Sequence, residues 1–265
     1  MRRDLQRLLR NRGVVIPLMA APIVVLVVLP ILLVGGGDFV LARSDIPLGD
    51  PSNPLTQFAP SDAGVASAGV AGPGRWAAFI LVSFLAPLYL LIPLIVSTVV
   101  AADSFAGEHE RKTMEAVLHT PTDDRELLVG KFLAAWLPAL VITIGGFVVY
   151  VLIANGVTWP QVGRLWFPTT SWMILAFWVA PGLAGLGLGL MVIVSSRVET
   201  LQSAHQIGSV MVLPIILLLI AQITGGVLLQ PEVVFLGGTI VWLLALLTLR
   251  IGTATFTREQ LARRL

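Results

Sequence analysis

The sequence predicts an all-α integral membrane protein with six transmembrane helices, and three observations support this prediction. Of the 265 residues, 56% are hydrophobic and only 12% are charged, whereas about a quarter of the residues in an ordinary globular domain are charged. The mean hydropathy is +0.90. Six apolar stretches are also long enough to cross the hydrocarbon core of a bilayer, which takes about 20 helical residues. The chain contains no Cys, which excludes a fold held together by disulfides.

The six predicted spans form one domain, residues 1–265. They cover about 14–34, 76–102, 127–154, 172–194, 207–229 and 233–251. Between them we expect a long external loop at 35–75 and a charged cytoplasmic loop at 103–126. The alternative for the first span is a cleaved signal peptide. Its apolar stretch is longer than is usual for one, and no A-x-A cleavage site follows.

The distribution of basic residues predicts the orientation. With a cytoplasmic N-terminus, 14 of the 17 Lys and Arg lie inside and three lie outside, namely Arg43, Arg75 and Arg164. Cytoplasmic loops of membrane proteins are enriched in Lys and Arg. An even number of spans then places both termini in the cytoplasm, and we expect a multi-pass protein of the cell membrane.

The first 13 residues predict a short amphipathic helix at the cytoplasmic surface of the membrane. Leu5, Leu8 and Leu9 share one helical face and five Arg surround them. Such a helix lies in the interface and is attracted by anionic lipid. The alternative is a charged leader that only sets the topology, and the two interpretations are compatible.

No Asp, Glu, Lys, Arg or His lies in the middle of any predicted span. Ion-coupled transporters and voltage sensors carry such groups despite their cost of roughly 2.5–3.5 kcal/mol each, so the pattern argues against a self-powered carrier. We expect most of the polar residues within the spans to form contacts between helices. The candidates for lining a pathway are Tyr89, Ser97 and Gln222.

The fourth span contains a stripe of small residues. Pro181, Gly185 and Gly189 recur every four residues, a spacing that lets two helix backbones approach closely. The stripe predicts either packing within the chain, which we favour, or an interface between subunits.

The sequence contains no arrangement of residues typical of an active site. Its three His, at 109, 119 and 205, lack the spacing of a metal site. The pair Gly130–Lys131 lacks the remainder of a phosphate-binding loop and begins a membrane helix. We therefore expect no catalytic, cofactor or metal site in this chain, and no nucleic-acid partner.

The cytoplasmic loop after the second span carries a dense group of charges. Glu108 and Lys112, and likewise Arg111 and Glu115, form i,i+4 pairs of opposite charge that predict a short helix. Pro121 then ends this helix. Asp123 and Glu126 form an Asp-led capping box for the third span.

The apolar side chains of the same helix are Met114, Val117 and Leu118. A solvated linker between two spans is one interpretation. An apolar group beside a face of paired charges is equally consistent with a docking element for a soluble partner. The residues alone leave both interpretations open.

Residues 101–132 resemble the hallmark segment of type-2 ABC transporter permeases, the membrane subunits of ABC exporters. The matching residues, in chain order, are Gly107, Glu108, Glu110, Arg111, Thr113, Glu115, Thr120, Pro121, Glu126, Leu127, Leu128, Gly130 and Lys131. A weaker likeness covers 195–214, which resembles the cytoplasmic entry to the fifth span of the same family.

The resemblance implies an export permease that pairs with a second permease copy in a homodimer, and with two ABC ATPase subunits that bind ATP and Mg²⁺. It implies that 108–119 is a coupling helix docked on an ATPase subunit. The residues carried over to that contact are Glu108, Glu110, Arg111, Lys112, Thr113, Met114, Glu115 and Leu118.

The last two spans depart from one part of the family. Polysaccharide exporters and sterol-type relatives place two short re-entrant helices before the last span, and 207–251 has no room for them. The long external segment is the first loop, a layout that resembles the drug, lantibiotic or sodium exporter branch. Two alternatives stay open: a membrane subunit for the assembly of haem or copper enzymes, and a self-sufficient carrier or channel.

Overall fold

The computed structural model describes residues 19–35, 74–110, 124–195, 201–225 and 229–255, and these ranges are almost entirely helical. This confirms the predicted all-α class. The helical elements in chain order are η1 (Val24–Val28), η2 (Ile31–Gly35), α6 (Gly74–Phe79), η3 (Ile80–Phe84), α7 (Leu85–Glu110), α9 (Asp124–Val162), α10 (Thr170–Ile174), η4 (Leu175–Val179), α11 (Ala180–Ser195), α12 (Leu201–Val210), α13 (Leu213–Gly225) and α14 (Pro231–Thr255). The elements marked η are π-helical.

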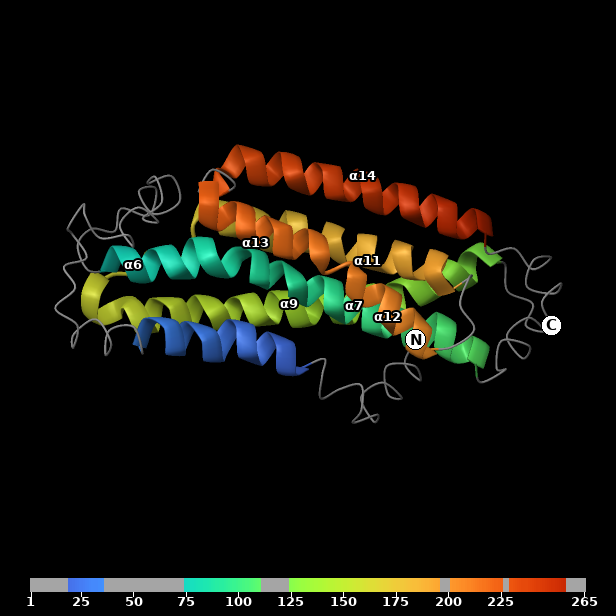
Figure 1. The fold of residues 1–265 in the computed structure, drawn as a ribbon, viewed down its shortest axis with the longest axis horizontal. Coiled ribbons are helices and arrows are strands. Elements are labelled where there is room, and N and C mark those ends of the chain that lie inside the picture. Colours follow the sequence, from blue (N-terminus) through green and yellow to red (C-terminus); the bar gives the residue numbers. More distant parts are fainter. Residues whose placement is uncertain (1–18, 36–73, 111–123, 196–200, 226–228, 256–265) are drawn as a thin grey trace.

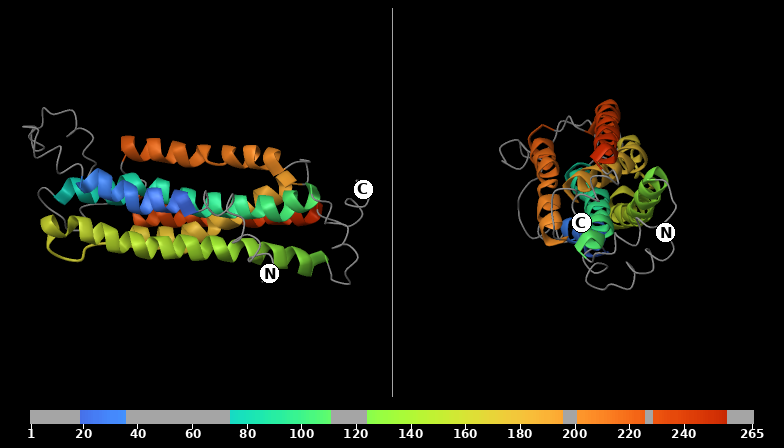
Figure 2. Two further views of the ribbon diagram at one scale, coloured as in Figure 1. Left: turned by 90° about the horizontal axis from the view of Figure 1, so that it is seen from below. Right: turned by 90° about the vertical axis from the view of Figure 1, so that its right-hand side faces the viewer.

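The long helices run side by side along the longest axis of the molecule (Figure 1). Helix α7 is central: it contacts α9, α11, α12, α13 and η1. Helix α14 packs on the outside of α11, as the end-on view shows (Figure 2). Helices α6, η3 and α7 follow one another without a break, as do α10, η4 and α11.

Four helices of the described residues are long and apolar enough to cross a membrane. They are Ala77–Ser104, Gly130–Pro160, Thr170–Ser195 and Pro231–Gly252. Two shorter apolar helices, Met19–Val34 and Gln206–Ala221, coincide with the first and fifth predicted spans. The predicted interfacial helix at 1–13 and nearly all of the external loop at 35–75 lie outside the described residues.

The fifth predicted span differs from the expected single helix. Helix α12 ends at Val210, Met211 and Val212 form a turn, and α13 begins at Leu213. Pro214 has no N–H and disfavours helical geometry in the residue before it. With 13 residues, α13 is about 20 Å long and does not cross about 30 Å of hydrocarbon by itself.

The boundaries of the cytoplasmic loop also differ from the predicted 103–126. Helix α7 continues as far as Glu110, and α9 begins at Asp124. The predicted coupling segment therefore begins as a direct extension of the second span. Most of the segment, 111–123, lies outside the described residues, as does the predicted cap residue Asp123.

Three of the π-helical segments are each followed by a proline. The residues that cap η1, η3 and η4 are Leu29, Leu85 and Ala180. Pro30, Pro87 and Pro181 lie one or two residues further on. Because proline removes one N–H and clashes with the carbonyl four residues earlier, the preceding turn widens to accommodate it.

The glycines of α11 are contact points for two neighbouring helices. On one face, Gly182 lies against Trp242 and Gly189 against Thr248, both on α14. On another face, Gly187 lies against Ser97 and Leu94 of α7. The small-residue stripe is thus used for packing within the chain, which is the alternative favoured from the sequence.

Replacing Gly187 with Ala is expected to destabilise the bundle by about 1–3 kcal/mol, the usual cost of overpacking a core. A Cβ atom at this position would lie 2.6 Å from Ser97 Oγ. Adding Ser97→Ala removes that oxygen and should recover part of the loss. Gly145→Ala is the matched control because its Cβ would meet no atom within 4 Å. Thermal unfolding in detergent measures all four proteins, and equal Tm values for the two glycine variants would contradict the packing.

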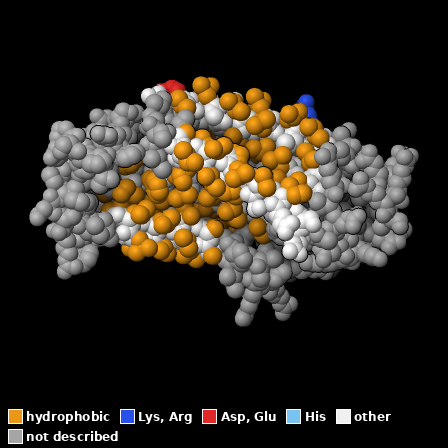
Figure 3. All heavy atoms as spheres, viewed as in Figure 1, with side chains coloured by type: hydrophobic (Ala, Val, Ile, Leu, Met, Phe, Trp, Pro, Cys, Tyr) orange, Lys and Arg blue, Asp and Glu red, His pale blue; other side chains and the backbone are white. Residues whose placement is uncertain are grey.

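The outer surface of the bundle is apolar. Figure 3 shows hydrophobic side chains covering the middle of the described surface. Helix α14 contributes many of them, including Leu236, Leu243 and Leu247, each more than half exposed. The described side chains that carry charge lie toward helix ends or in a link, and they are Asp103, Lys131, Arg164, Glu232 and Arg250. This distribution suits a surface that faces lipid.

Candidate coupling segment and transmembrane core

Two of the predicted coupling residues fall at the described end of α7. Glu108 and Glu110 belong to the last turn of α7, and their side chains lie outside the described part of the structure. The remaining predicted contacts lie wholly outside it: Arg111, Lys112, Thr113, Met114, Glu115 and Leu118. Their docking role stays a prediction.

The helices on either side of the coupling segment contact each other near this end. Lys131 of α9 donates a hydrogen bond from Nζ to the carbonyl oxygen of Ser104 on α7, at 3.5 Å. The cationic group therefore lies beside the last turns of α7, where helix carbonyls favour positive charge. This contact holds the start of α9 against the helix that leads into the coupling segment.

Two of the three predicted pathway residues are buried inside this chain. Tyr89 has no exposed surface, and its hydroxyl donates to the carbonyl of Thr143 on α9 at 3.5 Å. Ser97 is equally buried and donates to the carbonyl of Leu94 at 3.0 Å. Gln222 belongs to α13, and its side chain lies outside the described part. In this conformation, Tyr89 and Ser97 pack α7 against its neighbours.

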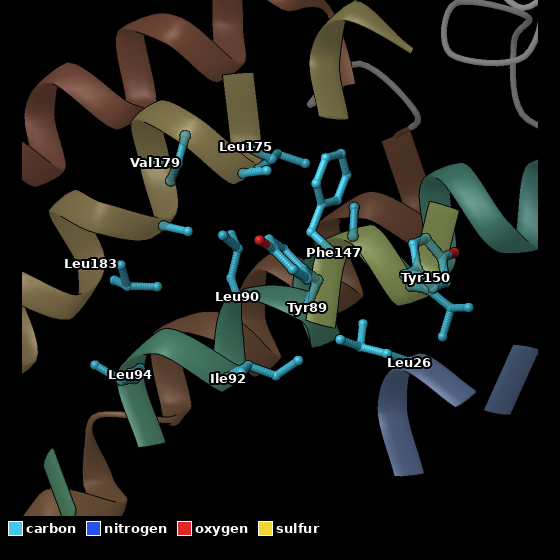
Figure 4. Close-up of a cluster of buried hydrophobic side chains, with 14 of the residues drawn as sticks. Leu26, Tyr89, Leu90, Ile92, Leu94, Phe147, Tyr150, Leu175, Val179 and Leu183 are labelled. Atoms are coloured by element: carbon cyan, nitrogen blue, oxygen red, sulfur yellow. The ribbon is translucent and has the colours of Figure 1, made fainter. Parts of the chain in front are cut away.

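The core around Tyr89 is an aromatic cluster, which we define as Tyr89, Phe147, Tyr150, Phe167 and Trp172. Trp172 stacks on Tyr150 with 4.9 Å between ring centroids. Trp172 also lies 5.3 Å from the ring of Tyr89. Figure 4 shows Tyr89, Phe147 and Tyr150 reaching into this region from α7 and α9. The cluster joins α7, α9, α10 and the link at 163–169 through ring contacts.

Two members of the aromatic cluster donate hydrogen bonds to the backbone of η3. The hydroxyl of Tyr150 donates to the carbonyl of Leu81 at 2.6 Å. The indole Nε1 of Trp172 donates to the carbonyl of Val82 at 2.9 Å. Within a membrane, helix carbonyls released by a proline need such partners, because no bulk water reaches them.

Two further indoles, from α9 and α14, donate hydrogen bonds to backbone carbonyls at the start of α11 and in η4. Trp136 donates from Nε1 to the carbonyl of Pro181 at 3.0 Å, and Trp242 donates to the carbonyl of Trp178, also at 3.0 Å. The two indole rings contact each other, with 6.5 Å between centroids. Helices α9 and α14 are therefore joined over the glycine face of α11.

The link at 163–169 is held to α9 by Asn155. Its Oδ1 accepts hydrogen bonds from the backbone N–H groups of Trp166 and Phe167, at 3.1 and 3.2 Å. Its Nδ2 donates to the carbonyl of Phe167 at 2.7 Å. Thr158 accepts a hydrogen bond from the indole of Trp166 at 2.7 Å. Nearly all of this network is buried.

Asn155→Leu is expected to lower the free energy of unfolding by about 1–3 kcal/mol, since it leaves two buried backbone N–H groups without an acceptor. Asn155→Asp keeps the acceptor oxygen and loses the amide donor, but adds a charge to a buried site. Hydrogen exchange of the amides of Trp166 and Phe167 checks the Leu variant. Unchanged protection of both amides would contradict the assigned role of Asn155.

Comparison with protein families decides what kind of membrane protein this bundle is. The family model described as "ABC-2 family transporter protein" matches residues 23–260. The chain belongs to the ABC-2 family. No curated protein and no solved structure matches it.

Membership of the ABC-2 family makes this chain a multi-pass membrane component of an ABC transporter, a kind of subunit that works with an ABC ATPase. The resemblance stated from residues 101–132 is confirmed at that level. Among the residues that the structure describes, no group of His, Asp or Glu is suited to hold a metal ion.

Several structural contacts of this ABC-2 protein were not predicted from its sequence. The sequence placed Tyr150, Trp172 and Trp136 within spans but did not predict their hydrogen-bond acceptors. Those acceptors are 69, 90 and 45 residues away in the chain. A usable signal was present in Pro87, because this proline predicts a released carbonyl that must find a donor on another helix.

Proposed function

We propose that this chain is the membrane-spanning permease subunit of an ATP-driven ABC exporter. The observation that carries the proposal is the ABC-2 family match, which covers residues 23–260. The apolar helices support six membrane crossings: four are long, and the two shorter ones coincide with the remaining predicted spans. With six crossings and the observed distribution of Lys and Arg, both termini are cytoplasmic.

In this proposal, the segment 108–119 docks on an ATPase subunit and α7 transmits its movement. Helix α7 has 26 residues and is therefore about 39 Å long. It runs from the aromatic cluster to the coupling segment without a break. When ATP draws two ATPase subunits together, displacement of the segment moves α7 relative to its neighbours.

Two copies of the permease form the substrate pathway between them in this proposal. Tyr89 and Ser97 are buried within one copy, so they line the pathway only when α7 separates from α9 and α11. Gln222 of α13 is the third pathway residue proposed. Because the described spans carry no Asp, Glu, Lys, Arg or His at mid-depth, an amphipathic or hydrophobic cargo suits this pathway better than a bare ion.

Copurification from native membranes tests the proposal. A tagged chain should bring down an ABC ATPase subunit, and the pair in liposomes should hydrolyse ATP, whereas the chain alone should not. Crosslinking of the pair should yield a permease dimer.

Two results would overturn the proposal of an exporter. Transport by the purified chain without ATP would indicate a carrier or channel. Accumulation of an immature haem or copper enzyme on deletion of the gene, with no export defect, would indicate an assembly subunit.

A further inference from the structure

The π-helical segment η3 is the point where other helices contact the backbone of the helix that leads to the coupling segment. Tyr150 of α9 donates to the carbonyl of Leu81, and Trp172 of α10 donates to the carbonyl of Val82. Leu81, Val82, Tyr150 and Trp172 are all buried. Both donors come from the aromatic cluster, so its packing and the geometry of η3 are linked.

Pro87 removes a helical donor from this helix in both of its possible hydrogen-bond registers. In the π register the N–H of Leu85 pairs with the carbonyl of Ile80, five residues earlier. Continued by one residue, this pairing joins Ala86 to Leu81 and leaves Val82 to residue 87, which is a proline without an N–H. Once α-helical pairing resumes in α7, Leu88 pairs with Phe84, so Ser83 is left without a helical donor as well. In the α register, Ala86 would pair with Val82, and Ser83 would be the residue left to Pro87. The π register therefore leaves two carbonyls without a helical donor and the α register leaves one, so the π register depends on donors from other helices.

The indole of Trp172 selects between the two registers. It supplies a donor to Val82, one of the two carbonyls that the π register leaves without one. The neighbouring segment η4 differs, since the carbonyl left to Pro181 there is that of Ala176, whereas Trp242 donates to Trp178. The match between a proline-released carbonyl and a donor from another helix is thus a property of η3.

We propose that η3 is a two-register hinge, held in its π register by Trp172 and Tyr150, and that its conversion to the α register turns α6 about its axis during the transport cycle. This inference rests on the proposed function, since α7 joins η3 to the coupling segment. A change of one residue in register rotates the helix beyond it by about 100°. Movement of α7 away from α9 and α10 withdraws both donors and releases the hinge.

The rotation changes which residues of α6 face the core. In the structure, Ala77 and Ala78 are buried, whereas Phe79 and Ile80 are partly exposed. The π segment contains one residue more than an α-helical segment of the same angular span. In the α register, each position of α6 is therefore taken over by the following residue. Ala78 and Phe79 become the buried pair, and Ala77 leaves the buried face.

Cysteine labelling tests the hinge directly, because the chain contains no cysteine of its own. Ala77→Cys and Phe79→Cys are introduced separately, and their labelling by a small maleimide is measured in liposomes. In the otherwise unchanged chain, Phe79→Cys should label faster. With Trp172→Phe and Tyr150→Phe added, which keep an aromatic ring at each position and remove both donors, the order of the two rates should reverse.

Trp136→Phe is the matched control. It removes the same indole donor from the carbonyl of Pro181, which keeps the N–H of Gly185 as its helical donor, so the labelling order should stay unchanged. Should the double variant fail to give a monodisperse protein, Trp172→Phe alone is used. Unchanged order in the folded variant, or the same reversal with Trp136→Phe, would overturn the hinge.

A second measurement separates the hinge from the proposed function. The copurified ATPase complex is labelled with and without ATP and vanadate, and the trapped complex should show the reversed order. Reversal in the double variant but none on trapping would overturn the use of the hinge in transport. Failure to copurify an ATPase would overturn the proposed function, while the labelling of the chain alone still decides the hinge.

Discussion

Exchanging the charges of Glu110 and Arg111 is expected to abolish ATP-driven transport and to lower the ATPase activity of the complex at least tenfold. If 108–119 docks on the ATPase, Glu110→Arg with Arg111→Glu sets like charges against each other at that contact. Like charges across an interface cost several kcal/mol, and about 1.4 kcal/mol corresponds to tenfold in affinity. The net charge of the chain stays the same, so long-range attraction is not altered.

Three measurements check this result: the amount of ATPase that copurifies, the ATPase rate in liposomes and the efflux of cargo from cells. Glu232→Lys is the control because Glu232 is exposed at the start of α14, the end of the bundle opposite to Glu110 (Figure 1). Activity of the charge-exchanged variant equal to that of the control would rule out 108–119 as the coupling segment.

Trp172→Ala is expected to lower the free energy of unfolding by about 3–5 kcal/mol, the range for removing a large aromatic side chain from a packed core. Trp172 has no exposed surface. Its ring lies 5.2 Å from that of Phe167 and 6.3 Å from that of Phe147, in addition to its contacts with Tyr89 and Tyr150. The variant also leaves the carbonyl of Val82 without its indole donor.

Unfolding of the purified protein in mixed micelles, followed by circular dichroism, measures this loss. Trp159→Ala is the matched control, because Trp159 lies on α9 with 52% of its surface exposed. Its effect should be small. Trp172→Phe should fall between the two, since it keeps most of the ring contacts. A Trp172→Ala protein as stable as the Trp159→Ala protein would show that the aromatic cluster does not hold the bundle together.

The apolar stretches by themselves predicted the helical class and the position of most helices. This worked because a backbone in hydrocarbon must satisfy its own hydrogen bonds, which leaves the helix as the local solution for an apolar run of about 20 residues. The resemblance at 101–132 pointed to the ABC-2 family for a similar reason, since that segment has a local pattern of charges and a proline. The family match over 23–260 agrees.

Helix interruptions were harder to predict. The fifth predicted span is interrupted just before Pro214, whereas Pro93 and Pro138 lie inside continuous helices. A proline removes the same N–H in every case. Whether the helix breaks, widens or continues depends on which neighbouring groups satisfy the released carbonyls.

The sequence alone therefore determined the membrane class, the approximate spans and the segment that resembles a coupling helix, because each follows from residues close together in the chain. Only the tertiary structure decided that Tyr89 and Ser97 are buried inside one copy, and that Trp172 and Tyr150 bond to the backbone of η3. Those contacts join residues far apart in the sequence. They depend on how helix faces meet, which periodicity within a uniformly apolar span does not specify.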